Sequence, residues 1–286
     1  MSEKVKKSSW PVHGWLGIIM IILFWILNWS LSGAHTHWLF FPLWLGFCLT
    51  VDAWVVYRKG DSMLLRNGKA YVSLFVISIP VWWLFELFNL RVQNWFYDGR
   101  ELFSDLQYAL IASINFSTVI PAVFGTAELI GSFAWLKNMH NRVRFSLTFK
   151  KVFVIFMSGW LMLGLLLIWP QYFFVFMWLS VSFIIEPVNI WAGNRSLLKE
   201  LSTGKWRTLL ALWIGCLICG FFWEMWNYYS YPKWLYSVPY VNFAHIFEMP
   251  LIGYLGYLPF SLELYAIYHL VTGFREKNRD EEFVQI

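Results

Sequence analysis

Charged side chains are scarce in this sequence. Asp, Glu, Lys and Arg together make up 14% of the 286 residues, whereas apolar residues make up 59% and the mean hydropathy is +0.53. Soluble domains carry about 25% charged residues, so this composition excludes an ordinary soluble domain. It indicates a chain whose solvent is the lipid bilayer.

Several motifs that mark enzyme classes are also missing. The sequence has no Gly-rich phosphate loop, no His-Glu-x-x-His zinc motif, no Gly-x-Ser-x-Gly nucleophile motif and no series of histidine boxes. Its three cysteines, Cys48, Cys216 and Cys219, all lie in apolar stretches, where thiols behave as small apolar side chains. We therefore predict no disulfide, no metal site and no cofactor.

Long apolar stretches are what the sequence does contain. A helix that spans a bilayer needs about 20 apolar residues, because each residue adds about 1.5 Å. Eight such stretches are bounded by charge, at roughly 14–32, 38–57, 70–90, 108–136, 149–168, 172–192, 206–228 and 244–272. We therefore expect an all-α fold, a polytopic membrane bundle of about eight transmembrane helices.

The basic residues predict how these helices are oriented. Of the 22 Lys and Arg residues, all but Arg91, Arg100 and Lys233 fall on one side of the predicted spans. Cytoplasmic loops are enriched in Lys and Arg, so we expect both termini in the cytoplasm, which for a prokaryote means the cytoplasmic membrane. This topology and anionic lipid headgroups account for the net charge of +5, and we predict no nucleic-acid partner.

The chain also contains an internal repeat. Shifting the sequence against itself by roughly 134–139 residues aligns polar, proline and aromatic residues that chance apolar similarity would not align. The aligned pairs are Trp44 with Trp178, Asp52 with Glu186, Glu86 with Glu224, Asn89 with Asn227, Trp95 with Trp234, Tyr97 with Tyr236, Pro121 with Pro259 and Glu128 with Glu263.

This repeat predicts the organisation of the chain. We expect a tail at 1–13, a first four-helix repeat at 14–136, a basic linker at 137–148, a second four-helix repeat at 149–273 and a tail at 274–286. An even number of spans returns the chain to the same side, so the two repeats are parallel and related by an axis along the membrane normal. Such an arrangement predicts a cavity between them.

Carboxyl groups within the spans are the candidate catalytic residues, because each costs at least about 2.5 kcal/mol in hydrocarbon. Glu86 and Glu224 fall in the outer third of their spans. Asn89 and Asn227 follow three residues later, on the same helix face, where an amide is expected to orient the carboxyl group. The alternative is that these pairs only lock helices together through buried hydrogen bonds.

The other intramembrane acids lie in the inner third. We expect Asp52 and Glu186 to reach the cytoplasmic surface and pair with nearby Arg residues. Glu128 and Glu263 lie on helices that contain Pro121 and Pro259. Because proline bends a spanning helix and frees a carbonyl, we interpret these two acids as markers of a cavity and add them to the candidate catalytic set.

Aromatic residues make up 21% of the chain, and four tryptophans cluster around the Glu and Asn pairs: Trp82, Trp83, Trp223 and Trp226. Aromatic faces stabilise cations, so these rings suit a reaction that passes through a carbocation. We predict that they bind substrate together with the residues of the two Trp-x-Tyr motifs, Trp95, Tyr97, Trp234 and Tyr236.

The order of acid, asparagine, Trp-x-Tyr, proline and second acid in both halves resembles the integral membrane lycopene cyclases of carotenoid synthesis, whose domains also occur in tandem. The resemblance implies an isomerase, an intramolecular lyase, that acts on a lipid-soluble isoprenoid such as a carotenoid. Domains of that family usually have three spans and a proline closely followed by paired acids, whereas here Pro259 precedes the single Glu263 by four residues.

The chemistry that this resemblance implies is redox-neutral. A carboxyl group surrounded by hydrocarbon stays protonated and can protonate an alkene, while a carboxylate in a more polar setting accepts the proton. We expect Glu86 or Glu224 to be the acid. A proton-coupled transporter of small molecules would also use intramembrane carboxylates, but the surrounding Trp, Phe and Leu favour an apolar substrate. A non-catalytic assembly protein would instead pair its acids with basic side chains and leave no pocket.

Overall fold

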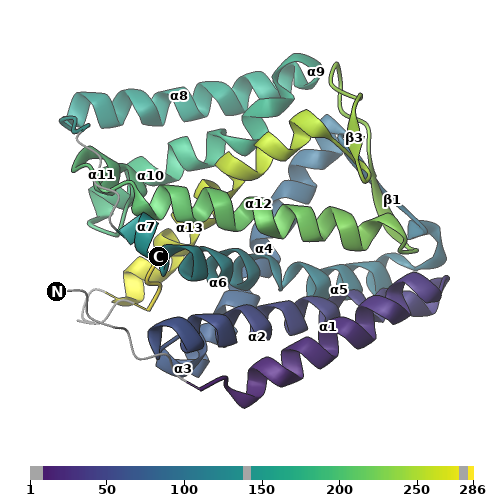
Figure 1. Ribbon diagram of the computed structural model, residues 1–286. Coiled ribbons are helices and arrows are strands. Elements are labelled where there is room, and N and C mark those ends of the chain that lie inside the picture. Colours follow the sequence, from purple (N-terminus) through teal and green to yellow (C-terminus); the bar gives the residue numbers. More distant parts are fainter. Residues whose placement is uncertain (1–8, 138–142, 277–282) are drawn as a thin grey trace.

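The computed structural model describes residues 9–137, 143–276 and 283–286. Its residues are 75% helical, which confirms the predicted all-α class (Figure 1). Parts of both predicted tails and the middle of the predicted linker lie outside the described residues.

The first half of the chain contains five long or medium helices, a strand and short connecting helices. The elements are α1 (Val12–Ser30), η1 (Ala34–Trp38), α2 (Phe40–Lys59), α3 (Met63–Arg66), α4 (Gly68–Val92), β1 (Trp95–Asp98), η2 (Arg100–Leu102), α5 (Asp105–Phe116), α6 (Val119–Gly131) and α7 (Ala134–Lys137).

The second half follows a similar order. Its elements are α8 (Phe149–Ile168), α9 (Pro170–Phe173), η3 (Phe174–Trp178), α10 (Ser180–Ala192), α11 (Leu197–Ser202), α12 (Arg207–Tyr228), β2 (Lys233–Tyr236), β3 (His245–Ile246), β4 (Met249–Pro250), η4 (Leu251–Gly256) and α13 (Tyr257–Glu276).

Long apolar helices indicate a membrane protein, although fewer pass a length and composition test than the eight expected. Six segments of the described chain are long and apolar enough to cross a bilayer: α1, residues 36–59, α4, residues 105–131, α8 and α12. The expected span at 172–192 is broken, because α9 with η3 and α10 meet at a bend of 40°. Counted as one, this bent pair makes a seventh span.

The last expected span, 244–272, is wrong over its first part. Residues 245–250 form the β3–β4 hairpin, and the α-helix begins only at Tyr257. This helix, α13, is not among the six candidates and carries Glu263 and His269, both buried. Because α13 packs against α10 and α12, neighbouring helices rather than lipid surround its polar residues.

The two prolines that were expected to bend spanning helices lie at helix starts instead. Pro121 and Pro259 each occupy the third position of their helix, α6 and α13. In this first turn the missing N–H group has no partner to lose. In a continuous helix the ring of Pro121 would clash with the carbonyl group of Ser117, four residues earlier. Helix α5 ends at Phe116, the residue before Ser117. The predicted kink is therefore a break between two short helices.

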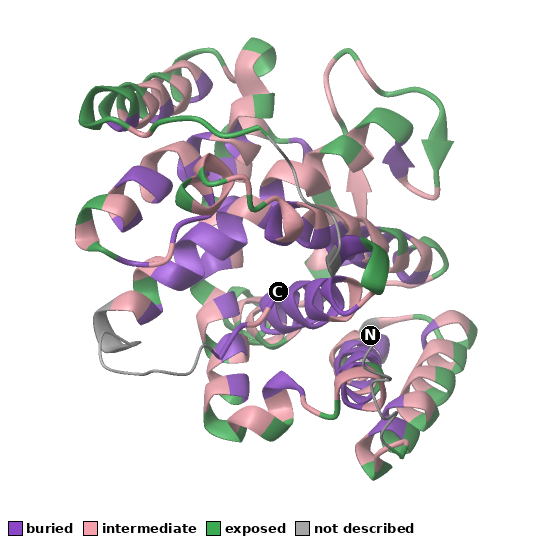
Figure 2. Cartoon of the chain, turned by 60° about the vertical axis from the view of Figure 1, so that its left-hand side comes forward, coloured by how far each residue is buried: buried purple, intermediate pink, exposed green. Residues whose placement is uncertain are grey.

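The helices form a central group with one long helix on each outer edge. Helix α6 packs against α2, α4 and α12, and α13 packs against α10 and α12. Helices α1 and α8 lie at opposite edges (Figure 1), and only 17% of the residues of each are buried, compared with 56% for α12. Figure 2 shows that buried residues gather in the central helices.

The two halves meet at one end in a two-stranded antiparallel ribbon of β1 and β2. Its register pairs the two Trp-x-Tyr motifs crosswise, so that Trp95 lies opposite Tyr236 and Tyr97 lies opposite Trp234. Side chains two residues apart in a strand share a face, so these four rings project from the same face of the ribbon. The short helices α3, α7 and α11 lie at the opposite end (Figure 1).

Asp52 and Glu186 serve the same structural purpose in the two halves. Asp52 accepts hydrogen bonds from Ser62 Oγ (2.8 Å) and Leu64 N (3.2 Å), at the start of α3. Glu186 accepts the equivalent pair from Ser196 Oγ (2.6 Å) and Leu198 N (2.9 Å), at the start of α11. The expected pairing with arginines is wrong, because each carboxyl group binds the free N–H groups of a helix N-terminus.

Candidate functional site

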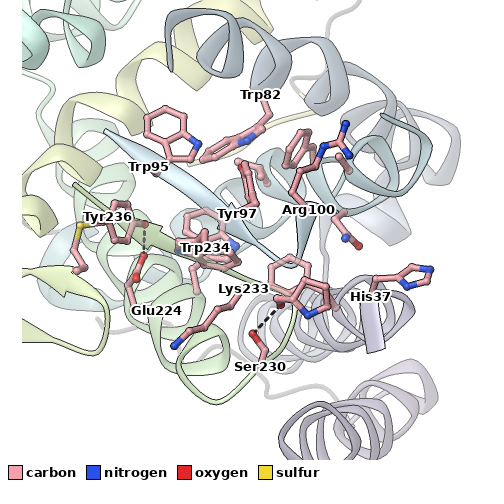
Figure 3. Close-up of a pocket in the computed structure, with 18 of the residues that line it drawn as sticks. His37, Trp82, Trp95, Tyr97, Arg100, Glu224, Ser230, Lys233, Trp234 and Tyr236 are labelled. Carbon is pink, nitrogen blue, oxygen red and sulfur yellow. Dashed lines mark hydrogen bonds between the residues drawn. The ribbon is translucent and has the colours of Figure 1, made fainter. Parts of the chain in front are cut away.

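A cavity of about 200 Å³ lies between the two halves, beside the β1–β2 ribbon. Its wall is mainly apolar and aromatic, with residues from both halves. Lining residues from the first half include Phe40, Trp82, Trp95, Tyr97, Tyr108, Phe116 and Val119, and those from the second half include Trp178, Trp223, Glu224, Trp234, Tyr236, Tyr257 and Phe260. Figure 3 shows several of these side chains gathered around the hollow.

Glu224 is the one carboxyl group that lines this cavity among the described residues. It is fully buried in the second half of α12. Its Oε1 atom accepts hydrogen bonds from the hydroxyl groups of Tyr236 (2.7 Å) and Tyr257 (2.8 Å), the first of which is drawn in Figure 3. Its Oε2 atom is buried and has no hydrogen-bond partner in the described structure.

An oxygen in this state is unfavourable, because a buried polar group without a partner costs about 1–3 kcal/mol and an ionised one costs more. Other buried acids also keep one oxygen without a partner, including Glu128 and Glu263. Glu224 differs from them because it is one of the residues that line the cavity.

Glu86, the matching residue of α4, has different surroundings. Three donors converge on its Oε1 atom: Trp82 Nε1 (2.9 Å), Trp95 Nε1 (3.1 Å) and the Tyr97 hydroxyl group. Its side chain is only partly buried, and it does not line the cavity itself. The three rings that bind it all do. Glu86 therefore fixes three aromatic residues of the cavity wall by accepting hydrogen bonds from their N–H and O–H groups.

The strand tyrosines remain hydrogen-bond donors over a wide pH range. Burial, followed by the nearby carboxyl group, raises the pKa of the Tyr97 and Tyr236 phenols well above their usual range. Both phenols therefore stay protonated at neutral pH, and each donates its hydrogen to a glutamate.

The asparagines do not contact the carboxyl groups, which corrects the predicted role of Asn89 and Asn227. Asn89 Nδ2 donates to the carbonyl oxygen of Trp95 (2.7 Å), and Asn227 Nδ2 donates to that of Trp234 (2.7 Å). Each Oδ1 atom also accepts from the backbone N–H group of the same tryptophan, at 3.3 and 2.9 Å. The amides thus fix the strands, and the strands place the rings.

Glu128 lies outside the cavity, in an ion-pair cluster. Its Oε1 atom accepts from Lys59 Nζ (2.6 Å) and Arg66 Nη2 (2.7 Å), so it joins α6 to the segment between α2 and α4. Glu128 does not line the cavity, so the structure gives its predicted catalytic role no support.

Glu263 is also separate from the cavity, and it is not equivalent to Glu128. It is fully buried in α13, and its Oε1 atom accepts from the backbone nitrogen of Val181 (3.1 Å), in the first turn of α10. The bend before α10 leaves N–H groups there without helical partners. Glu263 therefore stabilises the broken span, and the structure gives its predicted catalytic role no support.

Six of the eight predicted aromatic residues line the cavity: Trp82, Trp95, Tyr97, Trp223, Trp234 and Tyr236. The remaining two do not. Trp83 donates from Nε1 to Ser113 Oγ (2.9 Å) and packs α4 against α5. Trp226 is buried against Trp44, a residue of the opposite half, with ring centroids 5.1 Å apart.

Two important cavity residues were not predicted. Trp178 lines the cavity and stacks on Phe85 (ring centroids 5.4 Å apart) and Trp95 (6.1 Å). Its alignment with Trp44 in the repeat was a signal that could have identified it. Tyr257, which binds Glu224, lacked such a signal, because the first residue of α6 at the corresponding place is Val119.

Within the described residues, no group of three or more His, Cys, Asp or Glu side chains is arranged to hold a metal ion. The chemistry that the cavity can support with its own residues is proton transfer, with Glu224 as the group that faces a bound molecule and Glu86 linked to the cavity through Tyr97.

Comparisons of the chain with protein-family models, with curated protein sequences and with solved structures found no match.

Proposed function

We propose that the chain is an integral membrane enzyme that performs redox-neutral acid and base chemistry on a lipid-soluble isoprenoid. The observation that carries this proposal is that Glu224, whose buried Oε2 atom has no hydrogen-bond partner in the described structure, is a lining residue of an apolar cavity. A protonated carboxyl group satisfies such an atom best, and it is then poised to protonate a double bond. The proposal needs no cofactor.

We propose also that the two halves are parallel four-helix repeats, related by a two-fold axis along the membrane normal. The crosswise pairing of β1 and β2 supports this arrangement, because a two-fold axis makes equivalent strands antiparallel and exchanges their residues. The cytoplasmic end is then the end that holds α3, α7 and α11 (Figure 1), and the distribution of Lys and Arg in the sequence favours both termini on that side.

The proposed reaction begins at Glu224. Its Oε2 atom gives a proton to one carbon of a double bond, and the π electrons form the new C–H bond and leave a carbocation on the neighbouring carbon. A second double bond of the same molecule attacks this cation and closes a ring. The rings of Trp95, Trp178 and Trp223 line the cavity and stabilise the cation by cation–π attraction.

The reaction ends with the loss of a proton from the carbon next to the cation, which restores a double bond. Tyr97 Oη accepts this proton as its own proton passes to Glu86 Oε1. The product is an isomer of the substrate, and no electrons are gained or lost. Proton exchange with water returns Glu86 and Glu224 to their starting states.

The alternatives make different demands on the same residues. A non-catalytic assembly protein needs neither a cavity nor an acid without a basic partner, although the paired Glu128 fits such a protein. A proton-coupled transporter needs a polar path for its solute, whereas the wall of this cavity is mainly apolar, and Arg100, Lys233 and Glu224 are its charged lining residues among those described. An apolar substrate that enters from the bilayer suits this wall best.

Expression of the full chain in bacteria that accumulate lycopene and other acyclic isoprenoids tests the proposal. We expect a product with the mass of its precursor and a changed absorption spectrum. Glu224→Gln keeps the shape of the side chain but has no acidic proton, and it should reduce product at least about 100-fold. Size-exclusion chromatography must show that the variant is folded.

Two results would overturn the proposal. One is wild-type product formation by folded Glu224→Gln protein. The other is proton-dependent solute uptake into proteoliposomes that contain the wild-type chain, with no chemical change of any isoprenoid, which would establish transport.

A further inference from the structure

The two glutamates of the site differ in the residue that lies one turn before them. Trp82 precedes Glu86 by four residues, and Gly220 precedes Glu224 by four, so both face the same side of their helices as the acid. The ring of Trp82 fills the space beside Glu86 and donates Nε1–H to it (2.9 Å). Gly220 has no side chain with which to do so.

Tyr257 occupies the space that Gly220 leaves. A Cβ atom on Gly220 would lie 2.4 Å from Cε2 and 2.5 Å from Cδ2 of the Tyr257 ring, far inside van der Waals contact. The ring therefore depends on the absence of a side chain at position 220. From this position its hydroxyl group donates to Glu224 Oε1 (2.8 Å).

The exchange is reciprocal. Tyr257 is the first residue of α13 and precedes Pro259 by two, and Val119 is the first residue of α6 and precedes Pro121 by two. In the first half, α4 carries the large ring of Trp82 and α6 begins with the smaller Val119. In the second half, α12 carries Gly220 and α13 begins with the large ring of Tyr257. All three side chains of this exchange, Trp82, Val119 and Tyr257, line the cavity.

The consequence is that the two carboxyl groups are chemically unlike. Glu86 is partly exposed and receives three donors on one oxygen, two of them indole N–H groups that can only donate. Such surroundings favour a carboxylate. Glu224 is fully buried, receives phenol hydroxyl groups on Oε1 and keeps Oε2 bare. These surroundings favour a proton on Oε2.

We propose that Glu224 is the protonated acid of the site and Glu86 its carboxylate, and that Tyr257, accommodated by Gly220, is the positioning residue that decides which oxygen of Glu224 holds the proton. The catalytic role of the protonated acid rests on the proposed function. The difference in protonation between Glu224 and Glu86 can be measured without it. Tyr257 donates to Oε1 and so makes Oε1 the carbonyl oxygen of Glu224, which leaves the proton on Oε2.

Infrared spectroscopy of the full chain in lipid bilayers tests this assignment without any substrate. A protonated carboxyl group has a carbonyl band that shifts in D₂O, and an ionised one has none in that region. We expect Glu224→Gln to remove such a band and Glu86→Gln to leave it in place. Because Tyr257 donates to the carbonyl oxygen, Tyr257→Phe should move the band to higher frequency.

The control is Trp82→Phe, which removes the corresponding donor from Glu86 and should leave the band unmoved. Gly220→Ala should reproduce the shift of Tyr257→Phe, because the added methyl group displaces the ring. The double substitution of Gly220→Trp with Tyr257→Val gives the second half the arrangement of the first, and it should abolish the band by ionising Glu224.

The assignment is overturned if Glu86→Gln removes the band, if no variant of the two glutamates changes it, or if Tyr257→Phe leaves it unmoved. These outcomes are independent of product formation. A band that behaves as expected, in a protein whose Glu224→Gln variant still forms product, would sustain the assignment and reject the proposed reaction.

Discussion

Gly215 of α12 lies directly against the backbone of Ala127 in α6. A Cβ atom on Gly215 would be 2.7 Å from the nitrogen of Ala127 and 3.0 Å from its Cα atom. The contact joins the two halves at the centre of the molecule, because α6 belongs to the first half and α12 to the second. No flexible side chain stands between the helices that could move aside.

We therefore expect Gly215→Ala to force α6 and α12 apart and to lower the free energy of unfolding by about 1–3 kcal/mol. Thermal unfolding in detergent, followed by circular dichroism, measures the change. Gly164→Ala in α8 is the matched control, because an added Cβ atom there meets nothing within 4 Å. It should be neutral or stabilise by up to about 1 kcal/mol.

Glu128 is expected to matter for stability and not for chemistry. Glu128→Gln leaves Lys59 and Arg66, which are 17% and 10% exposed, without their shared counter-charge. Loss of one partner from such a buried group should cost about 3–5 kcal/mol. Asp61→Asn, at an acid that is 42% exposed beside the same Arg66, should cost less than about 1 kcal/mol. Equal costs in chemical denaturation would contradict the role assigned to Glu128.

Asn227 is expected to act on Glu224 through the strand. Asn227→Ala removes the partners of the N–H and carbonyl groups of Trp234, which should lower stability by about 1–3 kcal/mol and loosen Tyr236, two residues further. Asn227→Asp keeps an acceptor for the N–H group but has no donor for the carbonyl oxygen. Its effect on product formation should lie between those of wild type and Asn227→Ala, and a larger effect than that of alanine would refute this role.

The raised pKa of the Tyr97 and Tyr236 phenols predicts alkaline instability. Above about pH 10 the unfolded chain releases protons that the folded chain retains, so the free energy of unfolding falls as pH rises toward the higher pKa of the folded state. Below that pH this contribution to stability is complete. Melting temperatures between neutral and strongly alkaline pH should fall more steeply for wild type than for the double variant Tyr97→Phe with Tyr236→Phe.

The exposed Tyr240 provides the comparison for this experiment. Tyr240→Phe should leave the slope of the wild-type curve unchanged. If the double variant had the same slope as wild type, the alkaline loss of stability would have to come from other groups.

The sequence was sufficient to predict the helical class, since this class follows from the long apolar stretches. It was also sufficient to relate Glu86 to Glu224 and the two Trp-x-Tyr motifs to each other. The antiparallel ribbon that these motifs form was not predicted, because strand pairing between residues about 140 positions apart depends on how the halves dock.

The errors concern partners that come from distant segments. Glu128 has the same local pattern as a cavity acid, and only the fold brings Lys59 and Arg66 to it. The asparagines share a helix face with the glutamates, but each helix ends within a few residues and the chain turns back over the amide. The repeat alignment does not identify Tyr257, because the aligned residue is Val119 and the space for its ring is left by Gly220 in another helix.

The crosswise ribbon bears on how such a chain could have arisen. Two copies of a single half-length chain could pair β1 with an identical strand through the same two-fold relation, and each copy would then carry the same side chain at every equivalent place. Trp82 and Gly220 could not coexist in that homodimer, nor could Val119 and Tyr257. Fusion of two gene copies into one reading frame removes this constraint, because the two halves of one chain can carry different side chains at equivalent places.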